Sequence, residues 1–118
     1  PLVKYQELSS ETQAESSAVI RQRVMKARDI QLRRLQKYGI FCNAQMNHAM
    51  LKRECRMTRE AKDLLAQAFQ RLLLSARSYD RIIKVARTIA DLGGAGEIDG
   101  HHIAEAIQLR NDIGLNLD

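Results

Sequence analysis

Hydrophobic positions recur at helical spacing along most of the chain and are interrupted by residues that begin or end helices. This pattern predicts a first helix that begins at Ser16 or Ser17 and ends near Gly39. It also predicts one short helix within residues 40–56, for which Asn43 offers a cap. Thr58 then opens a longer helix whose buried face is expected to carry Ala61, Leu64, Leu65, Ala68 and Leu72.

The strongest helical pattern follows Ser75, which can accept a hydrogen bond from the first turn of a helix. Gly93 and Gly94 suit the left-handed turn that closes such a helix, and Asp99 caps a last helix through Arg110. The apolar stripe between them is Tyr79, Ile82, Ile83, Ala86, Ile89 and Ala90. We therefore predict an all-α fold, a compact bundle of four to five helices.

The two ends of the chain lack this pattern. Residues 1–15 are polar and show no helical stripe, so they are interpreted as a connector, with the helical domain at 16–112 and a flexible tail at 113–118. The first residue is Pro1 and not methionine, which fits a piece of a longer protein. No stretch has the apolar length of a membrane span or the pattern of a signal peptide, so a cytoplasmic location without membrane contact is expected.

A net charge of +5 and a pI near 9.6 favour a polyanionic partner, which can be DNA, RNA, a nucleotide or an acidic protein face. Aromatic residues make up only 4%, so backbone contact is favoured over base stacking. The first helix has a one-sided charge that fits DNA phosphates, the next subunit of a ring, or a solvated face. Its basic residues are Arg21, Arg23, Lys26, Arg28, Arg33, Arg34 and Lys37.

Catalytic and metal signatures are absent from the sequence. Phosphate-binding loops need glycines followed by lysine and Ser or Thr, and the glycines at 93–96 lack that lysine and a preceding strand. Cys42 and Cys55 form no CxxC pair and are interpreted as reduced thiols, and His101 and His102 are expected to point in different directions. The chain is therefore not expected to be an enzyme on its own, nor to bind a metal.

One charged residue lies where helix electrostatics disfavour it. Arg77 is placed at the start of the helix after Ser75, off the apolar stripe, and the helix dipole opposes a cation there. A partner anion, either a phosphate or a carboxylate, would give this placement a reason. Arg81 follows one turn later, while Lys84 and Arg87 are expected to form weak surface pairs with acids such as Asp80 and Asp91.

The run LSARSYDRIIKVARTIADL at 74–92 resembles the second sensor motif of AAA+ ATPases. Three further stretches make the resemblance narrower, since together with this run they resemble the C-terminal region of the magnesium-chelatase-like ATPases of the ComM competence-protein type. They are ESSAVIRQRVMKARDIQ at 15–31, NAQMNHAM at 43–50 and GEIDGHHIAEAIQLR at 96–110. The resemblance thus covers roughly residues 15–110.

The resemblance implies that this chain is a helical lid over ATP and magnesium held by a missing AAA+ core of the same polypeptide. Arg77 would then be the sensor arginine that grips phosphate, with Arg81 second and Arg87 third in rank. It also implies neighbouring subunits in a ring, usually a hexamer, and motor work on branched DNA in recombination and natural transformation. The chelatase that inserts magnesium into porphyrin shares the core but matches these motifs less closely.

An alternative from a different class is a free-standing basic helical module that binds nucleic acid or protein and never meets ATP. Salt dependence separates the two hypotheses, because such a module binds DNA by itself and releases counterions as it does so. A lid has little affinity for DNA until it is joined to its core.

Overall fold

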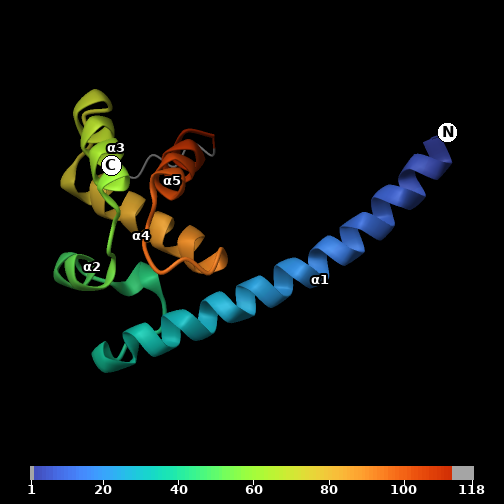
Figure 1. Cartoon of the computed structure of the whole chain (residues 1–118), viewed down its shortest axis with the longest axis horizontal. Coiled ribbons are helices and arrows are strands. Elements are labelled where there is room, and N and C mark those ends of the chain that lie inside the picture. Colours follow the sequence, from blue (N-terminus) through green and yellow to red (C-terminus); the bar gives the residue numbers. More distant parts are fainter. Residues whose placement is uncertain (1, 113–118) are drawn as a thin grey trace.

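The computed structural model describes the backbone of residues 2–112 and the side-chain surroundings of residues 17–111 (Figure 1). This part holds five α-helices and two short 3-10 helices, and an isolated bridge between Met57 and Ile98 is its only extended pairing. The predicted all-α bundle is therefore confirmed.

Helix α1 spans Leu2–Leu35 and is much longer than the pattern predicted. The start predicted at Ser16 or Ser17 is wrong because the segment before it contains no glycine or proline to stop a helix within 2–15. The end is close to the prediction, since a 3-10 helix at Gln36–Tyr38 leads to Gly39, whose φ of 70° is the left-handed conformation. The proposed connector at 1–15 is thus helical from Leu2 onwards.

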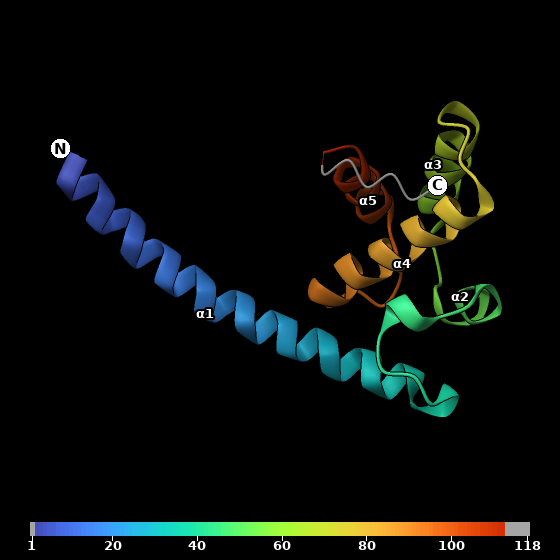
Figure 2. The same ribbon diagram turned by 180° about the vertical axis from the view of Figure 1, so that it is seen from behind.

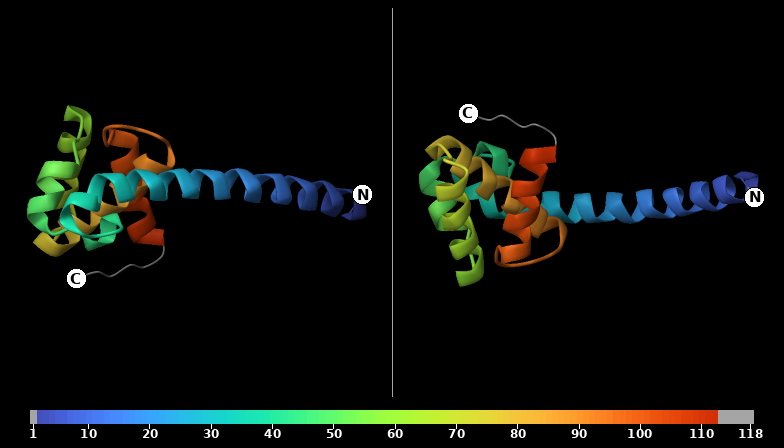
Figure 3. Two further views of the ribbon diagram at one scale, coloured as in Figure 1. Left: turned by 90° about the horizontal axis from the view of Figure 1, so that it is seen from below. Right: turned by 90° about the horizontal axis from the view of Figure 1, so that it is seen from above.

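Among the described side chains of α1, those in its C-terminal part are the ones buried against the rest of the molecule. Ala27, Gln31 and Leu35 are buried at helical spacing and α1 packs against α4, whereas residues 17–26 are all exposed. Figures 1 and 2 show the N-terminal half of α1 projecting away from the other helices, and the two views of Figure 3 agree.

The segment after Gly39 holds two helices where one was expected. A 3-10 helix at Asn43–Gln45 precedes α2 at His48–Glu54. The predicted cap was wrong, because Asn47 and not Asn43 caps α2, with its Oδ1 accepting from the N–H of Met50 at 2.9 Å. Asn43 is instead a buried polar residue, and its role is described with the site below.

Helix α3 spans Arg59–Arg71 and begins as predicted, with Thr58 Oγ1 accepting from the N–H of Ala61 at 3.2 Å. Ala61, Leu65 and Ala68 form its buried face. Leu72 was wrongly assigned to that face, because it lies just past the helix end and is exposed.

Helix α4 spans Ala76–Leu92 and lies at the centre of the core. Ser75 caps it as predicted, accepting from the N–H of Ser78 at 3.0 Å, and Gly94 takes the left-handed turn after its end with φ of 72°. The predicted stripe is buried at four positions and half-buried at two, Tyr79 and Ile89. The four buried positions are Ile82, Ile83, Ala86 and Ala90.

Helix α5 spans Gly100–Asp112 and packs against α3 and α4. Asp99 caps its start as predicted, with Oδ1 accepting from the N–H of Gly100 at 2.8 Å. In return, Nδ1 of His102 accepts from the N–H of Asp99 at 2.9 Å. His101 and His102 were expected to point apart, but their ring centroids lie 3.9 Å from each other.

The predicted tail at 113–118 lies outside the described residues. Within the described part, no helix combines the length and the apolar character that crossing a membrane needs. In that part no group of three or more His, Cys, Asp and Glu side chains is arranged to hold a metal ion.

Candidate functional site

The start of α4 presents Arg77 to solvent. Arg77 is the second residue of the helix, and no acidic residue lies in the first turn. Among the described residues, none forms a hydrogen bond or ion pair with its side chain. The N-terminal end of a helix repels a cation, so this guanidinium remains uncompensated by the described part of the chain.

Arg81 lies one turn beyond Arg77, and residues at this spacing are neighbours on a helix surface. Arg81 is half-buried and lines a groove of about 540 Å³ along α4. The other lining residues are mostly apolar: Ala44, Lys84, Val85, Thr88, Ile89, Leu92 and Leu109. Lys84 does not pair with Asp80 as expected, because its Nζ donates to the carbonyl of Ala44 at 3.3 Å while Asp80 lies 2.9 Å from Nδ1 of His48.

A buried ionic cluster lies at the other end of α4. Asp91 accepts two hydrogen bonds from Arg34, at 2.8 and 2.7 Å, and is also 3.1 Å from Nε of Arg87. Asn43 Nδ2 donates to Asp91 at 2.9 Å and to Thr88 Oγ1 at 3.1 Å, while its own N–H donates to Gln31 Oε1. We call Arg34, Asn43, Arg87 and Asp91 the Asp91 cluster. It joins α1, the 3-10 helix at 43–45 and α4.

Burial and pairing act differently on the two arginines. The hydrogen bonds to Asp91 raise the pKa of Arg34, whereas burial lowers the pKa of Arg87. Arg87 is 1% exposed and also donates to the carbonyls of Ala95 and Gly96, at 2.6 and 3.0 Å. Arg87 therefore secures the loop after α4 as well as the helix itself.

These contacts correct two expectations. Arg34 was assigned to the basic surface, but its guanidinium is turned inward against Asp91 and its side chain is only 14% exposed. Arg87 was ranked third as a phosphate ligand and was given a weak surface pair, but it is buried in the Asp91 cluster. The i, i+4 spacing of Arg87 and Asp91 did indicate that they pair.

The remaining basic residues of α1 are exposed, as expected. They are Arg21, Arg23, Lys26, Arg28, Arg33 and, in the following 3-10 helix, Lys37. Lys37 is paired with Glu54 at 2.8 Å. Figure 1 shows the start of α4 away from the projecting part of α1, so the structure does not bring Arg21, Arg23 and Lys26 together with Arg77.

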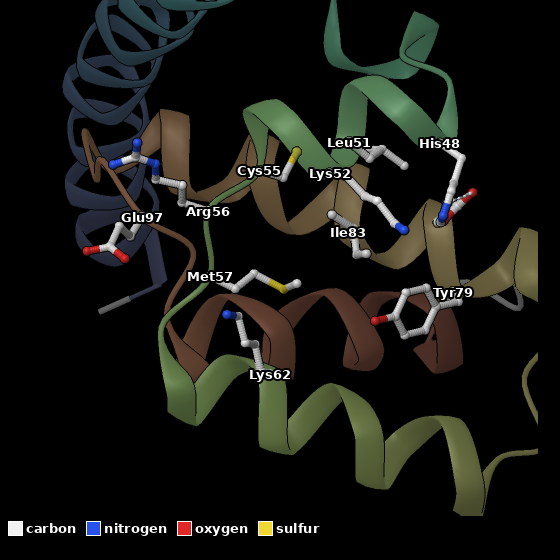
Figure 4. A pocket seen from close by; sticks show the side chains of 11 residues that line it. His48, Leu51, Lys52, Cys55, Arg56, Met57, Lys62, Tyr79, Ile83 and Glu97 are labelled. Carbon is white, nitrogen blue, oxygen red and sulfur yellow. Dashed lines mark hydrogen bonds and ion pairs between the residues drawn. The ribbon is translucent and has the colours of Figure 1, made fainter.

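A cavity of about 440 Å³ between α2, α3 and α4 was not predicted (Figure 4). Lys52 and Lys62 line it from α2 and α3, and Tyr79 and Ile83 line it from α4. Cys55 lies at its wall, where burial raises the pKa of the thiol to about 11. Such a cavity arises where three separate elements meet, which no local pattern reports.

Comparison with protein families gave a match to a family model described as "Magnesium chelatase, subunit ChlI C-terminal", over residues 14–110. The chain is 41% identical over 101 residues to the competence protein ComM of Haemophilus influenzae, covering 86% of this chain and 19% of that protein. It is 38% identical over 96 residues to the uncharacterized protein YifB of Escherichia coli, covering 81% and 18%. The uncharacterized protein Mb2921c of Mycobacterium bovis is 35% identical over 101 residues, covering 86% and 20%.

The chain therefore spans about a fifth of the length of these relatives. The search of solved structures found no match. The family match covers most of the chain and includes α4 with Arg77, the Asp91 cluster and most of α5. This chain belongs to the ComM and YifB family of magnesium-chelatase-like proteins, as a C-terminal domain of that family.

Proposed function

We propose that this chain is the C-terminal lid of an AAA+ ATPase and presents Arg77 to the phosphates of ATP bound by a core in the same polypeptide. The observation that carries the proposal is the exposed, uncompensated guanidinium of Arg77 at the start of α4. Family membership supports it, and so does the length of the relatives, which leaves room for a separate nucleotide-binding core. The protein would act in the cytoplasm.

The chemistry of Arg77 suits this role. A guanidinium donates paired hydrogen bonds to phosphate oxygens, and its charge stabilises the negative charge that develops during phosphoryl transfer. Arg81 would add a second cation about one helical turn away. The described residues offer no cluster of acids for magnesium, so the core would hold the metal.

The Asp91 cluster would connect the nucleotide to the rest of the protein. Arg77 is at one end of α4, and Asp91 at the other end holds Arg34 of α1 through two hydrogen bonds. A shift of α4 when Arg77 binds or releases phosphate would therefore be passed to α1. In a ring of subunits, usually a hexamer in this family, such a shift would report the nucleotide state to a neighbour.

The test is ATP turnover by the complete parent protein with Arg77→Ala, compared with Arg21→Ala as a matched control on α1. Both arginines are exposed, so neither substitution should reduce the melting temperature appreciably. We expect kcat to fall by about 10²-fold or more for Arg77→Ala, the usual cost of losing a group that stabilises transition-state charge. Equal turnover by wild type and both variants would refute the sensor role.

The exposed basic residues of α1 support a second function, contact with the phosphates of DNA. Five of them form no ion pair with an acid of the described residues, and they occupy little more than three helical turns. They are Arg21, Arg23, Lys26, Arg28 and Arg33. In the parent protein they would guide branched DNA during recombination, and in a free-standing module they would bind nucleic acid without ATP.

Salt dependence tests the contact with DNA. If the five residues each neutralise a phosphate, the slope of log K against log salt should approach about −4.5 for duplex DNA. Replacing Arg23 and Lys26 together by glutamine should make that slope shallower by about 2. Binding to DNA by this chain alone would favour the free-standing module, whereas binding only by the parent protein would favour the lid.

A further inference from the structure

The turn between α3 and α4 contains a residue in an unfavourable conformation. Leu73 has φ of 51°, the left-handed region, and is the one non-glycine residue with positive φ in the described part. A side chain at this φ crowds the following carbonyl, so glycine is the residue that usually fits here. Leu73 is also 87% exposed. A leucine at this position is therefore unfavourable in two independent ways.

The way the backbone ends α3 explains the left-handed φ of Leu73 but not the choice of a leucine side chain there. Beyond the end of α3, the N–H of Leu72 donates to the carbonyl of Ala68 at 2.9 Å and the N–H of Leu74 donates to that of Phe69 at 3.2 Å. Such bonds close a helix around one left-handed residue. Leu74 then turns into the core, where it is 5% exposed. Nothing in this closure requires a large apolar side chain at Leu73.

Leu73 belongs to a larger apolar surface. Phe69 is 43% exposed and Leu72 is 40% exposed, and we call these three residues the α3–α4 corner. Phe69 is held in place by an edge-to-face contact with Tyr79, with ring centroids 5.6 Å apart. A groove of about 450 Å³ lies beside the corner, with Ala66, Phe69, Ala76 and Tyr79 among its lining residues. The corner is thus an ordered apolar surface with a recess.

We propose that the α3–α4 corner is a contact surface for the ATPase core of the same polypeptide, with Leu73 as the apolar anchor that sets the position of Arg77. This inference rests on the lid function proposed above. Only Leu74, Ser75 and Ala76 separate Leu73 from Arg77. A core that holds a phosphate at Arg77 must therefore approach the corner as well.

Two further observations favour this partner. The relatives are about five times as long as this chain, so a large part of the polypeptide is available to cover the corner. Apolar contact beside Arg77 would also exclude water, and charge interactions become stronger where water is excluded. An anchored corner therefore places the guanidinium and strengthens its hold on phosphate. Leu73 acts as a positioning residue and does not touch ATP.

Leu73→Gly separates this role from a structural one. Glycine relieves the left-handed conformation, so the melting temperature of the 118-residue chain should rise by about 2–4 °C. In the complete parent protein the same change removes the anchor, and kcat/KM for ATP should fall by about tenfold or more because Arg77 is misplaced. A substitution that stabilises the domain yet reduces turnover cannot act through folding.

Leu73→Asp is the second variant, since a carboxylate at the corner would oppose an apolar partner surface. Leu32→Asp is the matched control, because Leu32 is an exposed leucine of α1. We expect Leu73→Asp to reduce turnover at least as much as Leu73→Gly, and Leu32→Asp to leave it within about twofold. Amide hydrogen exchange at 69–74 should also be slower in the parent protein than in this chain alone.

The inference and the lid function fail in different ways. If Arg77→Ala abolishes turnover while both Leu73 variants keep it, the corner is not an anchor and the lid function stands. If neither Arg77→Ala nor the Leu73 variants change turnover, both proposals are wrong. Unchanged hydrogen exchange at 69–74 in the parent protein would also overturn the inference, because a covered corner must exchange more slowly.

Discussion

Replacing Asp91 by alanine removes the carboxylate that Arg34 and Arg87 share. The side chain of Asp91 is fully buried, with the Arg34 guanidinium at 2.7 and 2.8 Å and the Arg87 guanidinium at 3.0 Å. After the substitution Arg34 can turn toward solvent, because its side chain is already 14% exposed. Arg87 cannot, since its side chain is 1% exposed. The cost therefore falls mainly on one buried, uncompensated cation.

The size of that cost follows from the geometry. Removing one partner of a buried ion pair costs about 3–5 kcal/mol. Arg87 keeps its bonds to the carbonyls of Ala95 and Gly96, which favours the lower part of this range. For a domain of roughly 100 residues, each kcal/mol lowers the melting temperature by about 4–8 °C. We therefore expect Asp91→Ala to melt at least about 12 °C below the wild type.

The assays are thermal melting and urea unfolding of the 118-residue chain, both followed by far-ultraviolet circular dichroism, and linear extrapolation of the urea data gives the free energy of unfolding. Asp63→Ala is the matched control, since Asp63 is exposed on α3 and its loss should change the free energy of unfolding by less than about 0.5 kcal/mol. A loss below about 1 kcal/mol for Asp91→Ala would refute the reasoning. The cluster would then contribute no more than an exposed ion pair.

Three further results are expected. Burial lowers the pKa of His102 below its ordinary 6.5. As the pH falls, His102 is therefore protonated in the unfolded chain before it is protonated in the folded chain. The contribution of His102 to stability is thus complete above about pH 6.5 and is lost as the pH falls from there through the folded-state pKa. Urea midpoints measured against pH should show this loss, and the loss should be smaller in His102→Gln. A thiol reagent should label Cys42 in the native protein, because Cys42 is exposed. Cys55 should react only after unfolding, because burial raises the pKa of its thiol to about 11. Rapid labelling of both cysteines in the native protein would contradict this prediction. The buried hydroxyl of Ser78 has no partner in the described part of the chain, so Ser78→Ala should raise the free energy of unfolding by about 1 kcal/mol. Ser75→Ala, which removes a helix cap, should lower the free energy of unfolding by about as much. A loss of stability for Ser78→Ala would show that its hydroxyl is needed.

Most helix boundaries could be predicted because local chemistry sets them. Thr58, Ser75 and Asp99 accept N–H groups of the turn that follows each of them, and Gly39 and Gly94 take left-handed conformations after helix ends. The apolar stripe of α4 was likewise predicted from spacing alone. These signals operate over a few residues, which is why the sequence is sufficient for them.

Contacts between distant segments could not be predicted in this way. Arg34 and Asp91 are 57 positions apart, so nothing near Arg34 distinguishes it from the exposed arginines of the same helix. The pattern also failed for Leu72, which shares the spacing of the buried face of α3 but lies just beyond its last turn. For the site, the exposed position of Arg77 followed from the sequence, whereas the cavity at Cys55 needed the assembled helices.

The projecting part of α1 has a mechanical consequence. Ala27 is the first buried residue among the described side chains of α1, and residues 2–26 of the helix backbone precede it; at 1.5 Å per residue they extend roughly 37 Å beyond it. A tilt of about 5° about Ala27 would therefore displace the far end by about 3 Å, given that length. The helix turns about its packed end, where Ala27, Gln31 and Leu35 are buried and Arg34 meets Asp91. An angular change too small to disturb the core would become, at its tip, a displacement as large as the length of a hydrogen bond.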